Sequence, residues 1–195
     1  MARKTAARRA ELRSRLIDIA EKTIASEGLG ALRARDLAQA ADCATGAIYN
    51  VFDDLGELTL QVNARTFKRL GAAVAAELAE APVDPTEQLI VMAQAYHHFA
   101  AANHNSWRAL FDLPRPPGEA APDWYLEEMG HLFAYISSPL SVLRPGMAAQ
   151  DTHDLTRALF SAVHGIVLLG LDDASAGVRR NDIDRMIALV LRNLS

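Results

Sequence analysis

Residues 33–52 read RARDLAQAADCATGAIYNVF, and this stretch decides the fold. Its spacing predicts a short helix over about 33–41, a tight turn near Asp42 and a second short helix over about 44–50. Two helices this short are unstable alone, so they must pack on each other and on a neighbouring element. The side chains at the expected crossing are small or apolar, as a steep helix-turn-helix angle requires. They are Leu37, Ala38, Ala41, Ile48 and Phe52.

Helical patterns continue on both sides of this stretch. Apolar positions from Leu12 to Ile24 share one face of a helix that Gly28 ends, and a long helix is expected from about Asp53 to Glu80. Pro82 and Pro85 mark the next junction. Further helices are expected at about 85–103, 105–112, 122–136, 150–172 and 180–194, with breaks at 114–118, Pro139 and 145–146. No segment alternates with a period of two, so the sequence predicts an all-α protein.

The charge is distributed unevenly between the two ends of the chain. Of 195 residues, 50% are hydrophobic and 23% are charged, which is typical of a globular protein. Residues 1–50 hold nine lysines and arginines against six acids, a net +3, whereas the 11 basic and 18 acidic residues that follow leave −7. Only the N-terminal end is therefore suited to a phosphate backbone.

Several classes of protein are not expected. The longest nearly apolar run, Ala162 to Leu171, is shorter than the roughly 20 residues of a membrane span, and charged residues interrupt the N-terminal stretch where a secretion signal needs an apolar core. We therefore expect a cytoplasmic protein with no membrane partner. Cys43 is the single cysteine, so no internal disulfide can form.

Catalysis and metal binding are not expected either. The chain contains no phosphate loop, Gly-x-Gly-x-x-Gly or Gly-x-Ser-x-Gly motif. The pair Glu128 and His131 occurs once, whereas a helical di-iron site needs it on two helices. His97 and His98 are adjacent, so their side chains are expected to leave different faces of a helix and not to share a metal ion. The sequence thus predicts a non-enzyme with no catalytic residue, cofactor or metal site.

The second helix of the 33–52 stretch exposes groups that can enter a DNA major groove. They are short or hydrogen-bonding, and none is acidic. Their positions are Thr45, Gly46, Ala47, Tyr49 and Asn50.

The order and spacing of Arg35–Ala38 and Gly46–Phe52 resemble the tetracycline-repressor (TetR) family over roughly residues 8–60. That resemblance implies a three-helix DNA-binding domain over 1–53, a connecting long helix over 54–81, and a helical ligand-binding and dimerisation domain over 82–195. The implied partners are double-stranded operator DNA, a second copy of the chain and an unknown small-molecule effector. The implied function is a ligand-responsive repressor that binds a palindromic operator as a homodimer.

Two residues depart from the family pattern. Asp42 stands at the turn glycine, where a left-handed backbone is expected, and aspartate tolerates it less well than glycine. Leu55 stands where the family commonly has a lysine, so one phosphate contact is missing. Arg35, Tyr49 and the N-terminal arm from Arg3 to Arg9 are expected to contribute more of the DNA binding.

The last two predicted helices carry apolar stripes suited to an intermolecular four-helix bundle, as the resemblance implies. The expected dimer interface consists of Leu159, Val163, Ile166, Ile187, Val190 and Leu191. Phe160, His164 and Gly165 also resemble a Trp-x-x-x-His-Gly signature of one subgroup of the family.

Most large aromatic side chains lie between residues 92 and 135, and they can line an apolar effector pocket or simply form the core. The expected pocket residues are Tyr96, Phe99, Trp107, Phe111, Trp124, Met129, Phe133 and His164. The sequence leaves a second class open, a helical bundle that binds small molecules or proteins but not DNA.

Overall fold

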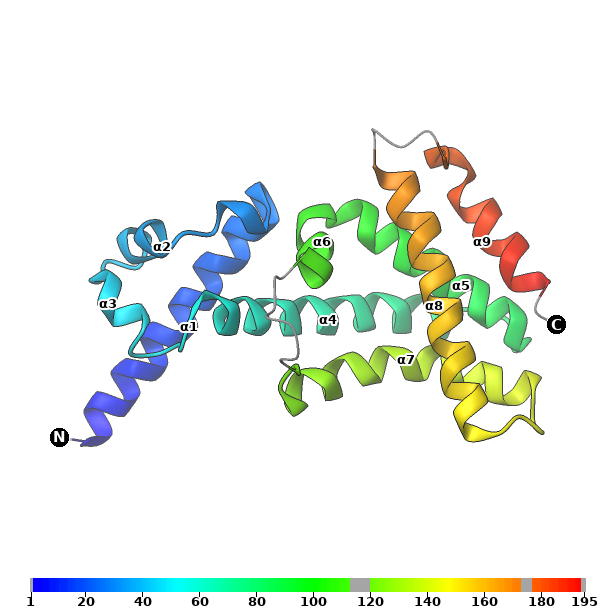
Figure 1. The fold of residues 1–195 in the computed structure, drawn as a ribbon, viewed down its shortest axis with the longest axis horizontal. Coiled ribbons are helices and arrows are strands. Elements are labelled where there is room, and N and C mark those ends of the chain that lie inside the picture. The colour runs from blue at the N-terminus through cyan, green and yellow to red at the C-terminus, as the bar shows by residue number, and fades with distance from the viewer. Residues whose placement is uncertain (1, 113–119, 173–176, 194–195) are drawn as a thin grey trace. The chain divides into compact units, whose positions relative to one another are not determined.

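The computed structural model describes residues 2–112, 120–172 and 177–193, in which every regular element is a helix (Figure 1). This confirms the predicted all-α class. The α-helices are α1 (Ala2–Glu27), α2 (Ala34–Ala40), α3 (Thr45–Ile48), α4 (Leu55–Ala79), α5 (Pro85–Ala102), α6 (His104–Asp112), α7 (Asp123–Leu143), α8 (Ala149–Leu171) and α9 (Ile183–Arg192). Short 3₁₀ helices, η1 (Leu29–Ala31) and η2 (Arg180–Asp182), precede α2 and α9.

Aspartates begin two of the long helices. The Asp54 carboxylate accepts a hydrogen bond of 2.7 Å from the Glu57 amide, and the Glu57 carboxylate accepts one of 2.8 Å from the Asp53 amide. This reciprocal arrangement satisfies amides that a helix start leaves unpaired. Asp84 caps α5 in the same way through the Glu87 amide at 2.9 Å, and Pro85 takes the first helical position.

Pro139 does not end a helix, so the helix break predicted there is wrong. It lies inside α7, which continues to Leu143. A proline within a helix costs about 3 kcal/mol because it removes one hydrogen bond and crowds the preceding turn. Burial of Ile136 and Leu140 on either side of it, at 7% and 2% exposed, offsets that cost. The expected break at 114–118 lies outside the described residues.

Packing divides the chain into two compact units. The first contains the described parts of residues 1–66 and 103–125, and the second contains those of 67–102 and 126–195. The helix α4 thus contributes its first half to one unit and its second half to the other, and α6 belongs to the first. The boundaries predicted near residues 53 and 81 separate a DNA-binding domain, a connecting helix and a ligand-binding domain. They divide the chain by function and not by packing, so they stay a prediction.

The first unit has one continuous apolar core. Side chains from five helices meet in it, and the five residues predicted at the helix crossing are all buried there. The core residues are Leu16, Ile17, Ala20, Ile24, Leu37, Ala38, Ala41, Ile48, Val51, Phe52, Leu58, Val62 and Ala109. The short helices α2 and α3 are therefore held by tertiary burial and not by their own propensity.

In the second unit, α9 packs on α5 and α8. The approach to α8 is very close at Gly170, where an added Cβ would lie 2.5 Å from two side-chain carbons of Ile183 and 3.1 Å from Val178. Ile183 is fully buried. Any larger residue at this position would have to displace the Ile183 side chain, so glycine suits this close contact between α8 and the start of α9.

We expect Gly170→Ala to lower the free energy of unfolding by about 1–3 kcal/mol, because the added methyl overpacks the contact with Ile183. Gly130→Ala in α7 is the control, since an added Cβ there would meet no neighbouring group of the described residues within 4 Å. That change should raise stability by about 0.5–1 kcal/mol through helix propensity alone. Thermal and urea unfolding measure both variants, and equal effects would contradict the close approach.

Among the residues that the structure describes, one helix, α8, is long and apolar enough to cross a membrane by length and composition, with a mean hydropathy of 1.4 over an 18-residue window. A core helix of a soluble protein passes the same test. Leu159, Val163, Val167 and Leu171 of α8 are buried within the chain. The apolar composition of α8 is therefore explained in part by its packing against other helices of the same chain.

Candidate functional site

The turn between α2 and α3 has a defined left-handed geometry. Asp42 has a φ of 48°, as the sequence predicted for this position. The Cys43 amide donates to the Ala38 carbonyl at 2.9 Å, and the Asp42 amide donates to the Gln39 carbonyl at 3.2 Å. This pair of bonds is a Schellman motif, which ends α2 and redirects the chain into α3.

The predicted reading residues lie on α3 and on the two positions after it, since the helix ends at Ile48 and not near Asn50, and they are largely exposed. Thr45, Gly46 and Asn50 are exposed, Tyr49 is 51% exposed, and Ala47 is half-buried. Ile48 between them is fully buried in the core of the first unit. The helix is thus anchored by one side chain and presents the others outward.

A hollow lined by three arginines and two acids adjoins this surface. Its volume is about 700 Å³, and it joins the N-terminal part of α1 to the α2–α3 turn and α3. The lining residues are Arg8, Arg9, Glu11, Leu12, Arg15, Asp42, Cys43, Ala44, Ala47, Asn50 and Val51. The structure therefore brings Arg9, Ala47 and Asn50 together with Arg8, which belongs to the predicted arm, and adds Arg15, which the sequence analysis did not select.

Arg35, Thr45, Gly46 and Tyr49 do not line this hollow. Arg35 is exposed on α2. Glu11 and Asp42 place negative charge among the arginines, so the hollow is mixed in charge and not uniformly basic.

Ion pairs brace α1 against the first half of α4. Arg65 Nη1 lies 2.6 Å from Asp18 and 2.8 Å from Glu21, and these hydrogen bonds raise the pKa of Arg65 above its ordinary value. Arg13 lies 3.4 Å from Glu57 and 4.8 Å from the centre of the Phe52 ring. Such partly exposed contacts fix orientation more than they add stability.

Two asparagines fasten α6 to the same unit. The Asn63 side chain, fully buried, donates to the Ala109 carbonyl at 2.9 Å, and Asn105 donates to the Ala25 carbonyl at 3.1 Å. Trp107 of α6 is completely buried. The helix α6 is therefore tied at both ends to the elements that carry α2 and α3.

Leu55 packs partly buried against the core of the first unit. A lysine would present a charge there, so the substitution replaces a polar group with an apolar packing contact.

The predicted pocket residues fall into both units. Trp107, Phe111 and Trp124 belong to the first unit, whereas Tyr96, Phe99, Met129, Phe133 and His164 belong to the second. Their shared role in a pocket stays a prediction.

Within the second unit, Tyr96 Oη lies 2.8 Å from His164 Nδ1, inside a group of aromatic rings. The Phe160 ring stacks on His164 with centres 5.5 Å apart, and it meets Tyr96 and Phe133 edge-on at 6.0 and 5.3 Å. This aromatic cluster combines apolar faces with one polar pair. Phe160, which sequence reasoning left out of the pocket, is central to it.

A groove of about 600 Å³ lies next to Phe133, between the second half of α7 and the start of α8. Besides Phe133 it is lined by small and polar side chains, among them Ser137, Ser141, Thr152 and Thr156.

The six residues expected at a dimer interface differ in exposure. Leu159, Val163, Ile187 and Leu191 are buried by the chain's own helices, at 5%, 7%, 0% and 2% exposed. Ile166 and Val190 are half-buried. Large apolar side chains on the outer side of the same helices remain exposed, Leu169 at 46% and Leu189 at 59%.

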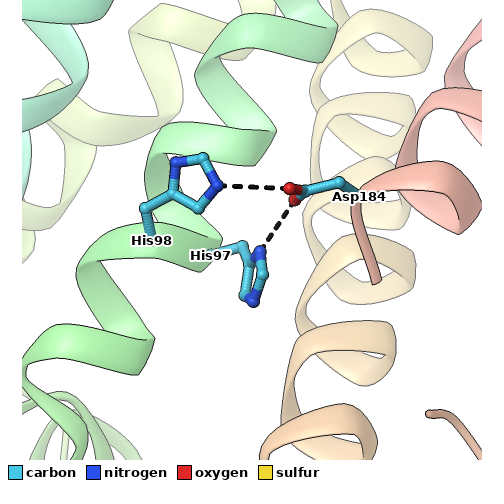
Figure 2. Close-up of side chains that lie close together, drawn as sticks. All are labelled: His97, His98 and Asp184. Carbon is cyan, nitrogen blue, oxygen red and sulfur yellow. Dashed lines mark hydrogen bonds and ion pairs between the residues drawn. The ribbon is translucent and has the colours of Figure 1, made fainter. Parts of the chain in front are cut away.

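His97 and His98 do converge, so the expectation that they cannot share a ligand is wrong. Figure 2 shows both rings directed at Asp184, His97 Nδ1 at 2.7 Å from one carboxylate oxygen and His98 Nε2 at 3.2 Å from the other. Neighbouring side chains leave a helix about 100° apart. Imidazole side chains are long enough to close that gap when both reach across to a second helix.

Residues 89–194 match the family model described as "Tetracyclin repressor-like, C-terminal domain". This match covers more than half of the chain. The chain therefore belongs to the tetracycline repressor-like family of transcriptional regulators. Its N-terminal helix-turn-helix and helical body are the arrangement that the resemblance implied.

Solved structures with the same fold cover nearly the whole chain. A protein of unknown function from Rhodococcus sp. RHA1 is 22% identical over 93% of this chain and 94% of its own, with a TM-score of 0.73. RolR in complex with resorcinol is 20% identical over 97% and 89%, with a TM-score of 0.69. A putative TetR family regulator from Shewanella sp. PV-4 is 14% identical over 94% and 97%, with a TM-score of 0.68. Curated proteins gave no match.

Proposed function

We propose that this protein is a cytoplasmic, ligand-responsive repressor that binds a palindromic operator as a homodimer and is not an enzyme. The observation that carries the proposal is the α3 surface, with Thr45, Tyr49 and Asn50 exposed beside a hollow lined by three arginines. Small hydrogen-bonding groups on a short helix can reach base edges in the major groove, and arginines beside them suit the phosphate backbone.

The side chains of this surface suit two different kinds of DNA contact, to base edges and to phosphates. Asn50 and Thr45 offer hydrogen bonds to base edges, and Tyr49 adds an apolar face with a hydroxyl. Arg8, Arg9 and Arg15 supply the charge that neutralises phosphates. Arg35 on α2 is a further phosphate contact in this scheme.

A dimer is required because one reading helix offers too few base contacts. Regulators of this family bind DNA as dimers, and half-sites lie roughly 34–36 Å apart, one helical turn of DNA. We propose that the second copy covers the outer side of α8 and α9. The apolar positions there are Ala158, Ala162, Ile166, Leu169, Met186, Leu189 and Val190, all exposed or half-buried.

The effector site that we propose is built around the aromatic cluster of the second unit. Tyr96 and His164, which hydrogen-bond each other, place a polar pair among Phe133 and Phe160. A small molecule with an apolar body and a polar end suits such a lining. RolR, whose structure contains resorcinol, is a relative in fold whose ligand has that character. Binding there would shift the spacing of the two reading heads and release the operator.

The experiment is capture of genomic fragments by the full chain, followed by fluorescence anisotropy on the recovered duplex and on a scrambled duplex. We expect a dimer on a partly palindromic site, with log affinity falling linearly in log salt by about 0.9 per neutralised phosphate. A small phenol that relieves binding should raise the melting temperature over the same concentration range. Salt-independent binding, or equal affinity for both duplexes, would contradict operator recognition, and no binding to either duplex would favour the alternative, a helical bundle that binds small molecules or proteins but not DNA.

A further inference from the structure

We propose that His97, His98 and Asp184 form a binding site for a divalent metal ion of the zinc type. The three side chains come from α5 and from the first turn of α9 (Figure 2). One ligating atom from each lies within 4.8 Å of the others. Two imidazole nitrogens and one carboxylate oxygen are a donor set that zinc uses, with a fourth position open to water.

The distances are close to those that coordination needs. Zinc bonds of about 2.0–2.2 Å in a tetrahedron put neighbouring ligand atoms roughly 3.4 Å apart. The two separations end on different oxygens of Asp184. His98 Nε2 lies 3.2 Å from one oxygen, close to this value, whereas His97 Nδ1 lies 2.7 Å from the other and must move away by about 0.7 Å, while the carboxylate turns one oxygen toward both nitrogens or binds through both. The two rings, with centres 5.2 Å apart, must tilt toward each other. Side-chain rotation alone can supply these changes.

A hydrogen-bonded contact that only holds α9 against α5 explains the position of His97 but not that of His98. The buried His97, with its side chain 11% exposed, is enough to fasten Asp184. The His98 side chain is 61% exposed, and a hydrogen bond from such a group adds little stability. Its convergence on the same carboxylate is what a third ligand requires, and its exposure gives an ion a path from solvent.

The position of Asp184 is fixed by its neighbour. Ile183 is fully buried against Gly170, so the first turn of α9 is held in place. A ligand on a fixed backbone loses less entropy when it binds a metal.

The surroundings tolerate a cation. An open hollow of about 350 Å³ adjoins Asp184, is not lined by either histidine, and is also lined by Gln94, Ala188, Leu189, Arg185 and Arg192, so the carboxylate is reached from solvent. The two arginines are paired with acids, Arg185 with Asp182 at 3.5 Å and Arg192 with Glu87 at 3.2 Å. Their repulsion is further screened by salt because both are exposed.

The test is calorimetric titration of the untagged full chain with zinc, supported by the visible spectrum of added cobalt(II). We expect saturable binding of one ion per chain and a rise in melting temperature with zinc. His98→Gln and Asp184→Asn, which keep size and polarity, should each weaken zinc binding at least tenfold and abolish the rise. The cobalt spectrum should show nitrogen and oxygen ligands in four-coordinate geometry.

His153→Gln is the matched control, since His153 also contacts an aspartate, Asp154, at 3.1 Å but belongs to no group of three possible metal ligands among the described residues. It should bind zinc as the unaltered chain does. Melting temperatures without metal report whether each variant folds. Absent saturable binding, or equal binding by the His98→Gln and Asp184→Asn variants, would overturn the site. None of these readouts depends on DNA, so the result is independent of the proposed repressor function.

Discussion

The variant Thr45→Ala/Tyr49→Ala/Asn50→Ala is expected to bind the operator at least 100-fold more weakly than the unaltered chain. Each lost base contact is worth about 1–3 kcal/mol, and all three side chains, from α3 and the two residues that follow it, are exposed. Helicity and dimerisation should be unchanged, because Ile48 alone anchors α3 in the core. Anisotropy on operator and scrambled duplexes measures the loss.

Charge variants separate base reading from phosphate binding. Arg8→Ala, Arg9→Ala and Arg15→Ala should each weaken binding to both duplexes and lower the salt slope by about 0.9 if the arginine contacts a phosphate. Asn181→Ala, an exposed asparagine of η2, serves as the control for Asn50→Ala. If the triple alanine variant still prefers the operator to the scrambled duplex, α3 is not the reading helix.

The sequence predicted the first unit well because its signals are local. Gly28 ends α1, Asp54 begins α4, and the turn at Asp42 follows from a backbone position that only a few residue types tolerate. The fold confirms each of them. Even the replacement of glycine by aspartate at the turn leaves the left-handed geometry in place.

Errors arose where tertiary packing overrides a local rule. Pro139 should break a helix by its own chemistry, but burial of the flanking residues carries α7 through it. His97 and His98 should diverge by helical periodicity, but a carboxylate on a distant helix draws both rings together. The spacing of residues around Pro139 and around His97 and His98 gives no sign of the tertiary contacts that decide each case.

Local sequence patterns also could not predict which helices pack together in each compact unit. Clustering of aromatic residues along the chain suggested one pocket, whereas α6 and its Trp107 pack within the unit that carries α2 and α3. Similarly, α8 and α9 carry apolar residues on two sides, and periodicity alone cannot tell which side the chain covers itself.

The difference between the covered and the exposed sides of α8 and α9 decides which residues should be changed to test dimerisation. Leu191 and Val163 are buried within one chain, so a glutamate at either position would unfold the second unit and say nothing about a partner. Leu169 and Leu189, at 46% and 59% exposed, tolerate a charge in the single chain. Only a covering second copy would make that charge costly.

We therefore expect Leu169→Glu and Leu189→Glu each to raise the dimer dissociation constant at least 100-fold, because an unpaired carboxylate buried in an interface costs about 3–5 kcal/mol. Val142→Glu is the matched control, an apolar position on α7 that is 67% exposed. Analytical ultracentrifugation should detect monomers for the first two variants and a dimer for the control. Operator affinity should fall with the dimer although α3 is unchanged, while the melting temperature extrapolated to low protein concentration stays near that of the unaltered chain. If both variants remain dimers at the concentration where the control does, the second copy binds a different face of the protein.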